Sequence, residues 1–127
     1  MIGNEALQIG IYNQVTNSGL TIYPYLPKTA QYPFVNLGEE MVMDVSTKGK
    51  KHYELYHTLH VWSQSTNKAE INSMVQQVIQ AMDEPFTLGE GYYVSRTRLE
   101  SATVLLDPDV EALFHANIQF QFTVSKG

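Results

Sequence analysis

The apolar residues near the amino terminus recur at helical spacing. In the segment NEALQIGIYNQVT they fall on one side of a helix at Leu7, Ile11 and Val15. This spacing predicts a helix over residues 4–17. Asn4 has a residue type that favours the N-cap position, and Gly19 follows the pattern where a glycine commonly ends a helix.

A second helix is predicted by a longer apolar stripe. Its members fall at i, i+3, i+4, i+7, i+8 and i+11: Ile71, Met74, Val75, Val78, Ile79 and Met82. Asn67 and Glu70 have the spacing of a capping box at its start, and Pro85 follows its end. The helix therefore presents one apolar face to the rest of the fold.

The last part of the chain alternates strictly between apolar and polar residues. The apolar positions are Phe114, Ala116, Ile118, Phe120, Phe122 and Val124. The polar positions between them are His115, Asn117, Gln119, Gln121 and Thr123. Alternation with a period of two predicts a strand that buries one face and leaves the other polar.

A similar alternation predicts a long strand over residues 52–64, which contain neither glycine nor proline. Because side chains alternate between the two faces of a strand, His52, His60 and Trp62 share one face. His57 then points to the opposite face.

Three further strands are predicted from weaker patterns. The segment LTIYPYLP contains two prolines and is typical of a short edge strand or an extended lead-in. Residues 32–45 form a strand with a bulge or bend at Gly38, and the glycine- and lysine-containing segment STKGKKH connects it to the next strand. Residues 92–107 form another long strand, and Asp107–Pro108–Asp109 marks the turn after it.

The order of helix, strands, helix and strands predicts an α+β fold in a single domain over residues 1–127. We expect an antiparallel or mixed sheet of four to five strands with the two helices packed against it. Neither a repeat nor a linker interrupts the chain.

Composition narrows the function classes. The hydrophobic fraction of 43% and the charged fraction of 17% are globular values, and the net charge of −5 disfavours a nucleic-acid binder with a basic surface. The absence of cysteine excludes disulfides and thiolate sites. No apolar run approaches the roughly 20 residues of a membrane span. The pattern is that of a soluble protein of intracellular origin, and no motif indicates a cofactor.

The histidines are the first candidates for metal or acid–base chemistry. A pair of catalytic carboxylates is the other candidate, from acidic residues at predicted bends and turns: Glu39, Glu40, Asp83, Glu84, Asp107 and Asp109. A site built from His52, His60 and His115 with nearby carboxylates would suit a small metal-dependent hydrolase. Strand alternation separates His57 from this set, and the helical spacing of zinc-protease ligands is absent. Histidines with a structural role are the simpler interpretation, and no catalytic residue is predicted.

Several charged and polar residues are candidates for an interface. The cluster Lys48, Lys50 and Lys51 suits either a solvated loop tip or a contact with an acidic partner. Arg96, Arg98 and Glu100 share one row of the predicted strand 92–107, as a charged interface or a solvent face requires. The candidates for a subunit or partner interface are Asp44, Lys48, Lys50, Lys51, Arg96, Arg98, Glu100, Gln119 and Gln121.

The chain resembles the tail completion, or tail terminator, proteins of long-tailed bacteriophages (siphophages) and prophages, which include head–tail joining proteins. The resemblance rests on the first helix, on YPFVNLGEE and the lysine-containing loop, and on the run HTLHVWSQSTNKAEINSMVQQVIQAMD. The strand 95–107 followed by 114–124 also fits the family's order. The resemblance covers nearly the whole chain.

This resemblance implies a structural virion protein and no enzyme. Such a subunit assembles with copies of itself into a ring, typically a hexamer, at the head-proximal end of the tail tube. The ring ends tube polymerisation and joins the tail to the head connector, and DNA passes through it without sequence-specific binding. An adaptor that binds a cellular protein, or the hydrolase above, is the alternative.

Overall fold

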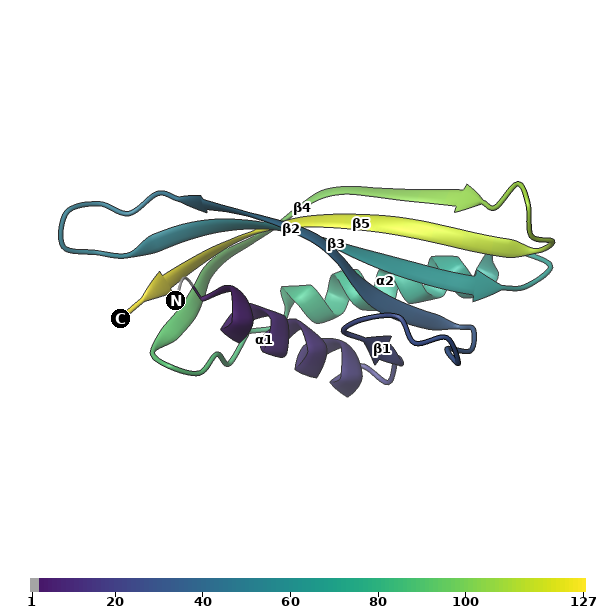
Figure 1. Ribbon diagram of the computed structural model, residues 1–127, viewed down its shortest axis with the longest axis horizontal. Helices are drawn as coiled ribbons and strands as arrows, with labels where there is room; N and C mark the ends of the chain where they lie inside the picture. Colours follow the sequence, from purple (N-terminus) through teal and green to yellow (C-terminus); the bar gives the residue numbers. More distant parts are fainter. Residues whose placement is uncertain (1–2) are drawn as a thin grey trace.

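A five-stranded sheet with both helices packed on one of its faces forms the structure (Figure 1). The computed structural model describes residues 3–127. The elements in chain order are α1 (Asn4–Asn17), β1 (Ile22–Tyr23), β2 (Phe34–Asp44), β3 (His52–Gln64), α2 (Ala69–Asp83), β4 (Tyr92–Leu106) and β5 (Leu113–Lys126). The α+β prediction is confirmed.

The sheet is mixed. Its strand order is β1-β2-β3-β5-β4, in which β1 pairs parallel with β2 and the other neighbours pair antiparallel. The proline-flanked segment predicted as a short edge strand is β1, an edge strand of two residues. Figure 1 shows that the β2–β3 hairpin and the β4–β5 turn lie at opposite ends of the elongated sheet.

The side chains of β3 and β5 that face the helices are buried. They pair without interruption from His52–Ser125 to Gln64–Leu113. Leu55, Leu59 and Val61 on β3 meet the apolar row of β5, and all three are fully buried. The predicted stripe of α2 covers these rows with four buried residues, Ile71, Met74, Val78 and Met82, and two partly buried ones, Val75 and Ile79.

The bounds predicted for the first helix are confirmed by α1, but its predicted N-cap is wrong. Gly3, with a φ of 84°, is the N-cap of α1, and the Asn4 side chain instead donates to Glu40 Oε1 at 3.1 Å. A side chain at position 3 would lie 2.9 Å from the Tyr92 ring, so the tight entry into the helix requires glycine. The predicted end is confirmed, because Gly19 follows the last turn with a φ of 95° and donates to the Thr16 carbonyl.

The predicted capping box at α2 is wrong. Lys68 is the N-cap, one residue later than expected, and Asn67 Oδ1 accepts from the Ala69 amide at 2.9 Å. Glu70 accepts a hydrogen bond from the Ser63 hydroxyl at the end of β3, so its carboxylate ties the helix to the sheet.

The bulge predicted at Gly38 is confirmed. The β2–β3 register shifts between Leu37 and Glu40. A Cβ atom at Gly38 would lie 2.5 Å from His60 Nε2 and 2.9 Å from the Thr58 carbonyl oxygen. The two strands can therefore approach at this point only because residue 38 has no side chain.

Candidate functional site

The face of the sheet opposite the helices carries the residues that could act on other molecules. No helix covers this face within residues 3–127 (Figure 1). We call it the open face. From β3 it carries His52, Glu54, Tyr56, Thr58, His60 and Trp62, and from β5 the predicted polar row His115, Asn117, Gln119, Gln121 and Thr123.

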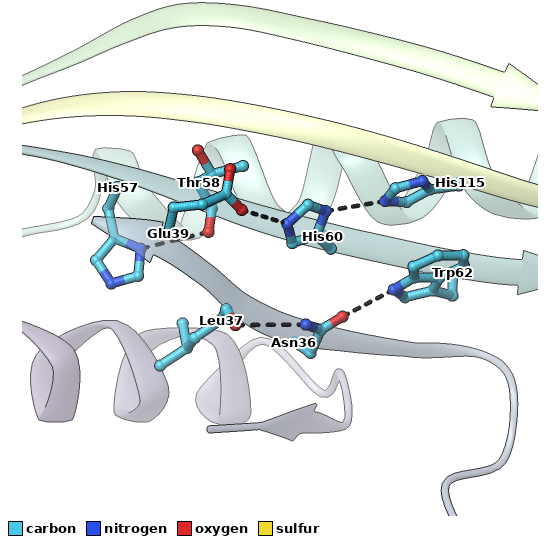
Figure 2. Close-up of polar contacts among 8 residues, drawn as sticks. All are labelled: Asn36, Leu37, Glu39, His57, Thr58, His60, Trp62 and His115. Atoms are coloured by element: carbon cyan, nitrogen blue, oxygen red, sulfur yellow. Dashed lines mark hydrogen bonds and ion pairs between the residues drawn. The ribbon is translucent and has the colours of Figure 1, made fainter. Parts of the chain in front are cut away.

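A hydrogen-bonded chain joins two of the histidines on this face. His60 Nε2 lies 2.9 Å from Glu39 Oε1, and His60 Nδ1 lies 2.9 Å from His115 Nε2 (Figure 2). The His115 ring stacks on Trp62 with centroids 3.8 Å apart and an interplanar angle of 4°. Trp62 Nε1 in turn donates to Asn36 Oδ1 at 2.7 Å.

The protonation of this chain follows from its donors and acceptors. An ionised Glu39 only accepts, so a neutral His60 carries its proton on Nε2 and accepts on Nδ1. His115 must then donate from Nε2. The pKa of Glu39 is lowered, first by its own backbone amide and then by the His60 hydrogen bond. The pKa of His115 is lowered by burial and by the adjacent His60.

His57 lies on the other face, as the alternation predicted. It is only 3% exposed, and its ring lies against the core beside Glu40, with Nε2 3.7 Å from Glu40 Oε2. Its Nδ1 lies 3.4 Å from the Thr58 carbonyl oxygen, so both ring nitrogens face an acceptor oxygen. Burial lowers the pKa of His57 below its ordinary value of 6.5.

The structure contradicts the alternative of a site built from His52, His60 and His115. The structure brings His60 and His115 together but leaves His52 near the other end of β3, where its Nδ1 lies 2.6 Å from Ser125 Oγ. Eight residues of extended strand separate His52 from His60, a distance of about 26 Å. Within residues 3–127, no group of three or more histidine, aspartate or glutamate residues could hold a metal ion.

Glu39 was missed as the partner of His60. Its nearest sequence signal was the bend at Gly38, which moves the following residue out of regular alternation. The contact between His60 and His115 depends on the β3–β5 register, which a single sequence does not contain. The acidic pair Asp107 and Asp109 forms a turn, in which Asp107 Oδ1 accepts from the Asp109 and Val110 amides.

The lysine cluster and Asp44 lie at one end of the molecule. Lys48, Lys50 and Lys51 are exposed in the loop that joins β2 to β3, the tip of the projecting hairpin. Asp44 ends β2 and accepts from the Ser46 amide at 2.9 Å, and hydrogen bonds from Ser46 lower its pKa.

The other interface candidates lie together on β4 and β5. Arg96 pairs with Thr123 and Arg98 with Gln121 across the two strands. Glu100 is the extra residue of a bulge between Leu99 and Ser101, so Ser101 takes the regular place opposite Gln119. Ser101 Oγ donates to the amide oxygen of Gln119 at 3.3 Å, and Glu100 and Gln119 line one cavity of about 310 Å³.

Within residues 3–127, two strands of the sheet have an edge to which no other strand pairs. β4 pairs with β5 alone, and β1 pairs with β2 only at Val35 and Asn36, so no strand covers β2 from Leu37 to Asp44. Exposed apolar side chains accompany both edges: Met41 and Met43 on β2, and Leu99, Leu105 and Leu106 on β4. Such edges and patches are typical of surfaces that pair with another chain.

Comparison with known proteins decides the family. A family model described as Tail completion protein gp17 matches residues 13–125. The chain belongs to this family. A solved structure titled "Virion of native gene transfer agent (GTA) particle" contains a similar chain, with a TM-score of 0.81 and 19% sequence identity over 95% of this chain and 96% of that one. This likeness shows a shared fold. No curated protein sequence matches significantly.

As a member of the tail completion family, the chain is a structural component of a phage tail within the virion. The family predicted from the sequence is confirmed. Neither helix described in residues 3–127 is long and apolar enough to cross a membrane.

Proposed function

We propose that this tail completion protein forms a closed ring of six copies at the head-proximal end of the tail tube. There the ring ends tube polymerisation and joins the tail to the head connector. Its partners are further copies of itself, the tail tube protein, and the connector or a head completion protein.

The observation that carries the proposal is the pair of free edges on opposite sides of the sheet. The two edges differ, one formed by β4 and the other by β2 from Leu37 to Asp44. A contact between unlike surfaces repeats from copy to copy, and it generates a ring when the rotation closes. The similar chain comes from a structure of a virion, where a subunit of this fold is part of a larger assembly.

The charge distribution fits the proposed position. The chain carries a net charge of −5. An acidic ring disfavours adhesion of the DNA that passes through it, because like charges repel. The exposed lysines Lys48, Lys50 and Lys51 at the hairpin tip suit a contact with an acidic neighbour, either the tube protein or the connector.

The proposal is tested by polymerising purified tail tube protein with and without this chain and measuring tube lengths by negative-stain electron microscopy. We expect shorter tubes with a ring of extra density at one end. A matched control is the chain with Val110→Ala, which changes one exposed side chain in the β4–β5 turn and should still cap the tubes. Unchanged tube lengths at saturating concentrations of folded protein would overturn the proposal, and binding to a cellular protein instead would favour the adaptor.

A further inference from the structure

We infer that neighbouring copies join edge to edge, with the outer edge of β4 in one copy pairing antiparallel to Leu37–Asp44 of β2 in the next. The inference rests on the proposed ring and specifies the contact that closes it. It follows from strand direction, from charge and from an apolar groove beside α1.

Strand direction permits this pairing. β2, β3, β5 and β4 are successive antiparallel neighbours, so β4 runs opposite to β2. Rotation about an axis along the strands preserves these directions, and β4 of one copy therefore meets β2 of the next in antiparallel orientation. β1 occupies the outer edge of β2 at Val35 and Asn36, which limits the pairing to the eight residues from Leu37 onward.

Continuing the rows of the sheet into the next copy gives one register and its charge match. On the open face one row runs from Met41 through Tyr56 and Gln121 to Arg98. If the same row continues across the junction, Arg98 of one copy lies opposite Met41 of the next copy. Glu39 lies two positions further along the same face, and a long side chain reaches such a diagonal neighbour.

This charge pairing is available only between copies. Strands β3 and β5 separate β4 from β2 within one chain, a distance of about 14 Å for three strand spacings. Neither Arg96 nor Arg98 forms an ion pair within residues 3–127, and Glu39 is largely exposed although it contacts His60. Arg96 and Arg98 on β4 are thus complementary in charge to Glu39 on β2, and Glu100 is the acidic residue beside them on β4.

An apolar groove lies on the helix side of the same junction. It has a volume of about 380 Å³, and its lining residues are Glu5, Gln8, Ile9, Tyr12, Pro24 and Leu37. In the extended rows, Ala102 of the neighbouring copy comes opposite Leu37, with Leu99 beside it on the same face. Ile9 is 62% exposed and Leu99 is 43% exposed, so the contact removes apolar surface of both copies from water.

Disulfide trapping tests the pairing in a chain that contains no native cysteine. Met41→Cys is combined in turn with Arg96→Cys, Arg98→Cys and Ser101→Cys, the three successive open-face positions of β4. Directly opposite residues in antiparallel strands have Cα atoms about 4.5–5.5 Å apart, which suits a disulfide. When the protein is bound to tail tubes, we expect one of the three pairs to form disulfides between copies. The products should be a ladder of covalent oligomers whose largest member is the complete ring.

Single-cysteine variants are the matched controls. A contact between unlike edges leaves Met41→Cys alone and Arg98→Cys alone without a partner, so both should stay monomeric on oxidation. Covalent dimers from either single variant would mean that like edges meet, and this would overturn the inference.

Charge reversal gives an independent readout. Arg98→Glu should weaken assembly about tenfold or more, because it places like charges together. Adding Glu39→Arg to the same chain should restore much of the loss, since every copy supplies both edges. Ile9→Asp should also weaken assembly, whereas Val110→Asp in the distant β4–β5 turn should not.

The outcomes separate this inference from the proposed function. A ring that forms without any of the three cross-links, and that tolerates Arg98→Glu, overturns the edge pairing and leaves the ring intact. Folded protein that forms no oligomer, either alone or on tail tubes, overturns both.

Discussion

The two faces of the central strands have the same backbone but different partners. On one face Leu59, Ile118 and Phe122 are buried under the helices. On the other face lie the side chains of their sequence neighbours His60, Asn117 and Gln121, and no helix covers them within residues 3–127. The covered face is completed by this chain, whereas the open face and the two outer edges leave surface for other chains.

This difference separates folding from assembly. Residues on the covered face determine whether the subunit folds, because each contributes buried apolar area. Exposed residues on the open face and the edges contribute less buried apolar area, so they can determine what the subunit contacts.

The largest effect is expected from Phe122→Ala. Phe122 is fully buried between Phe86, at 5.7 Å between ring centroids, and Phe120, at 5.8 Å. Removing its ring leaves a cavity and should lower the free energy of unfolding by about 3–5 kcal/mol. Urea denaturation measures this, with Gln121→Ala on the open face as the control at about 0.5 kcal/mol or less. Equal losses in the two variants would mean that the faces do not differ.

Gly38→Ala should have an intermediate effect, although within residues 3–127 β2 has an unpaired edge at this residue. The new methyl group would press against His60 and the Thr58 carbonyl, and overpacking of this kind costs about 1–3 kcal/mol. Gly89→Ala is the control, because a Cβ there meets no atom within 4 Å. Denaturation midpoints that coincide for the two variants would show that β2 and β3 are not in close contact at the bulge.

Mild acid should weaken the covered face through His57. Burial lowers the pKa of His57 in the folded state below its ordinary value of 6.5, so the unfolded chain binds the proton more readily. Stability should be constant above about pH 6.5 and fall as the pH drops below it. The lowered pKa of His115 acts in the same direction.

The measurement is urea denaturation at pH 7.5 and pH 5.5, for the parent chain and for His57→Leu. The variant should lose less stability between these pH values than the parent does. An unchanged loss would assign the acid sensitivity to groups other than His57.

The smallest effect on folding is expected at the hairpin tip. Replacing Lys48, Lys50 and Lys51 by glutamine should change the free energy of unfolding by about 0.5 kcal/mol or less, because all three side chains are exposed. Attachment of the protein to tail tubes or connectors should instead weaken and lose part of its salt dependence. A large loss of stability would mean that the loop is part of the folded core.

The sequence predicted the covered face better than the open one. Period-two alternation in residues 114–124 and the stripe of α2 identified the buried rows, because burial imposes its period on the residue types. The bulge at Gly38 was also predicted. The capping box and the Asn4 cap were wrong, because the side chains of Glu70 and Asn4 form hydrogen bonds with Ser63 and Glu40 instead.

The candidate site depended on register, which a single sequence leaves open. Alternation placed His60 and His115 on polar rows, but only the β3–β5 pairing brings their nitrogens to 2.9 Å. The bulges at Gly38 and Glu100 displace Glu39 and Glu100 from regular alternation. Free edges are a property of strand order, so no local pattern could reveal them.

The central claim is that this chain acts by assembling at the end of a tail tube. The most direct test is a cryo-electron microscopy reconstruction of tail tubes capped by the purified protein. We predict a closed ring of six copies at one end of each tube, with the edges of neighbouring sheets in contact. Density for the protein scattered along the tube, or absent from the tube ends, would contradict the account.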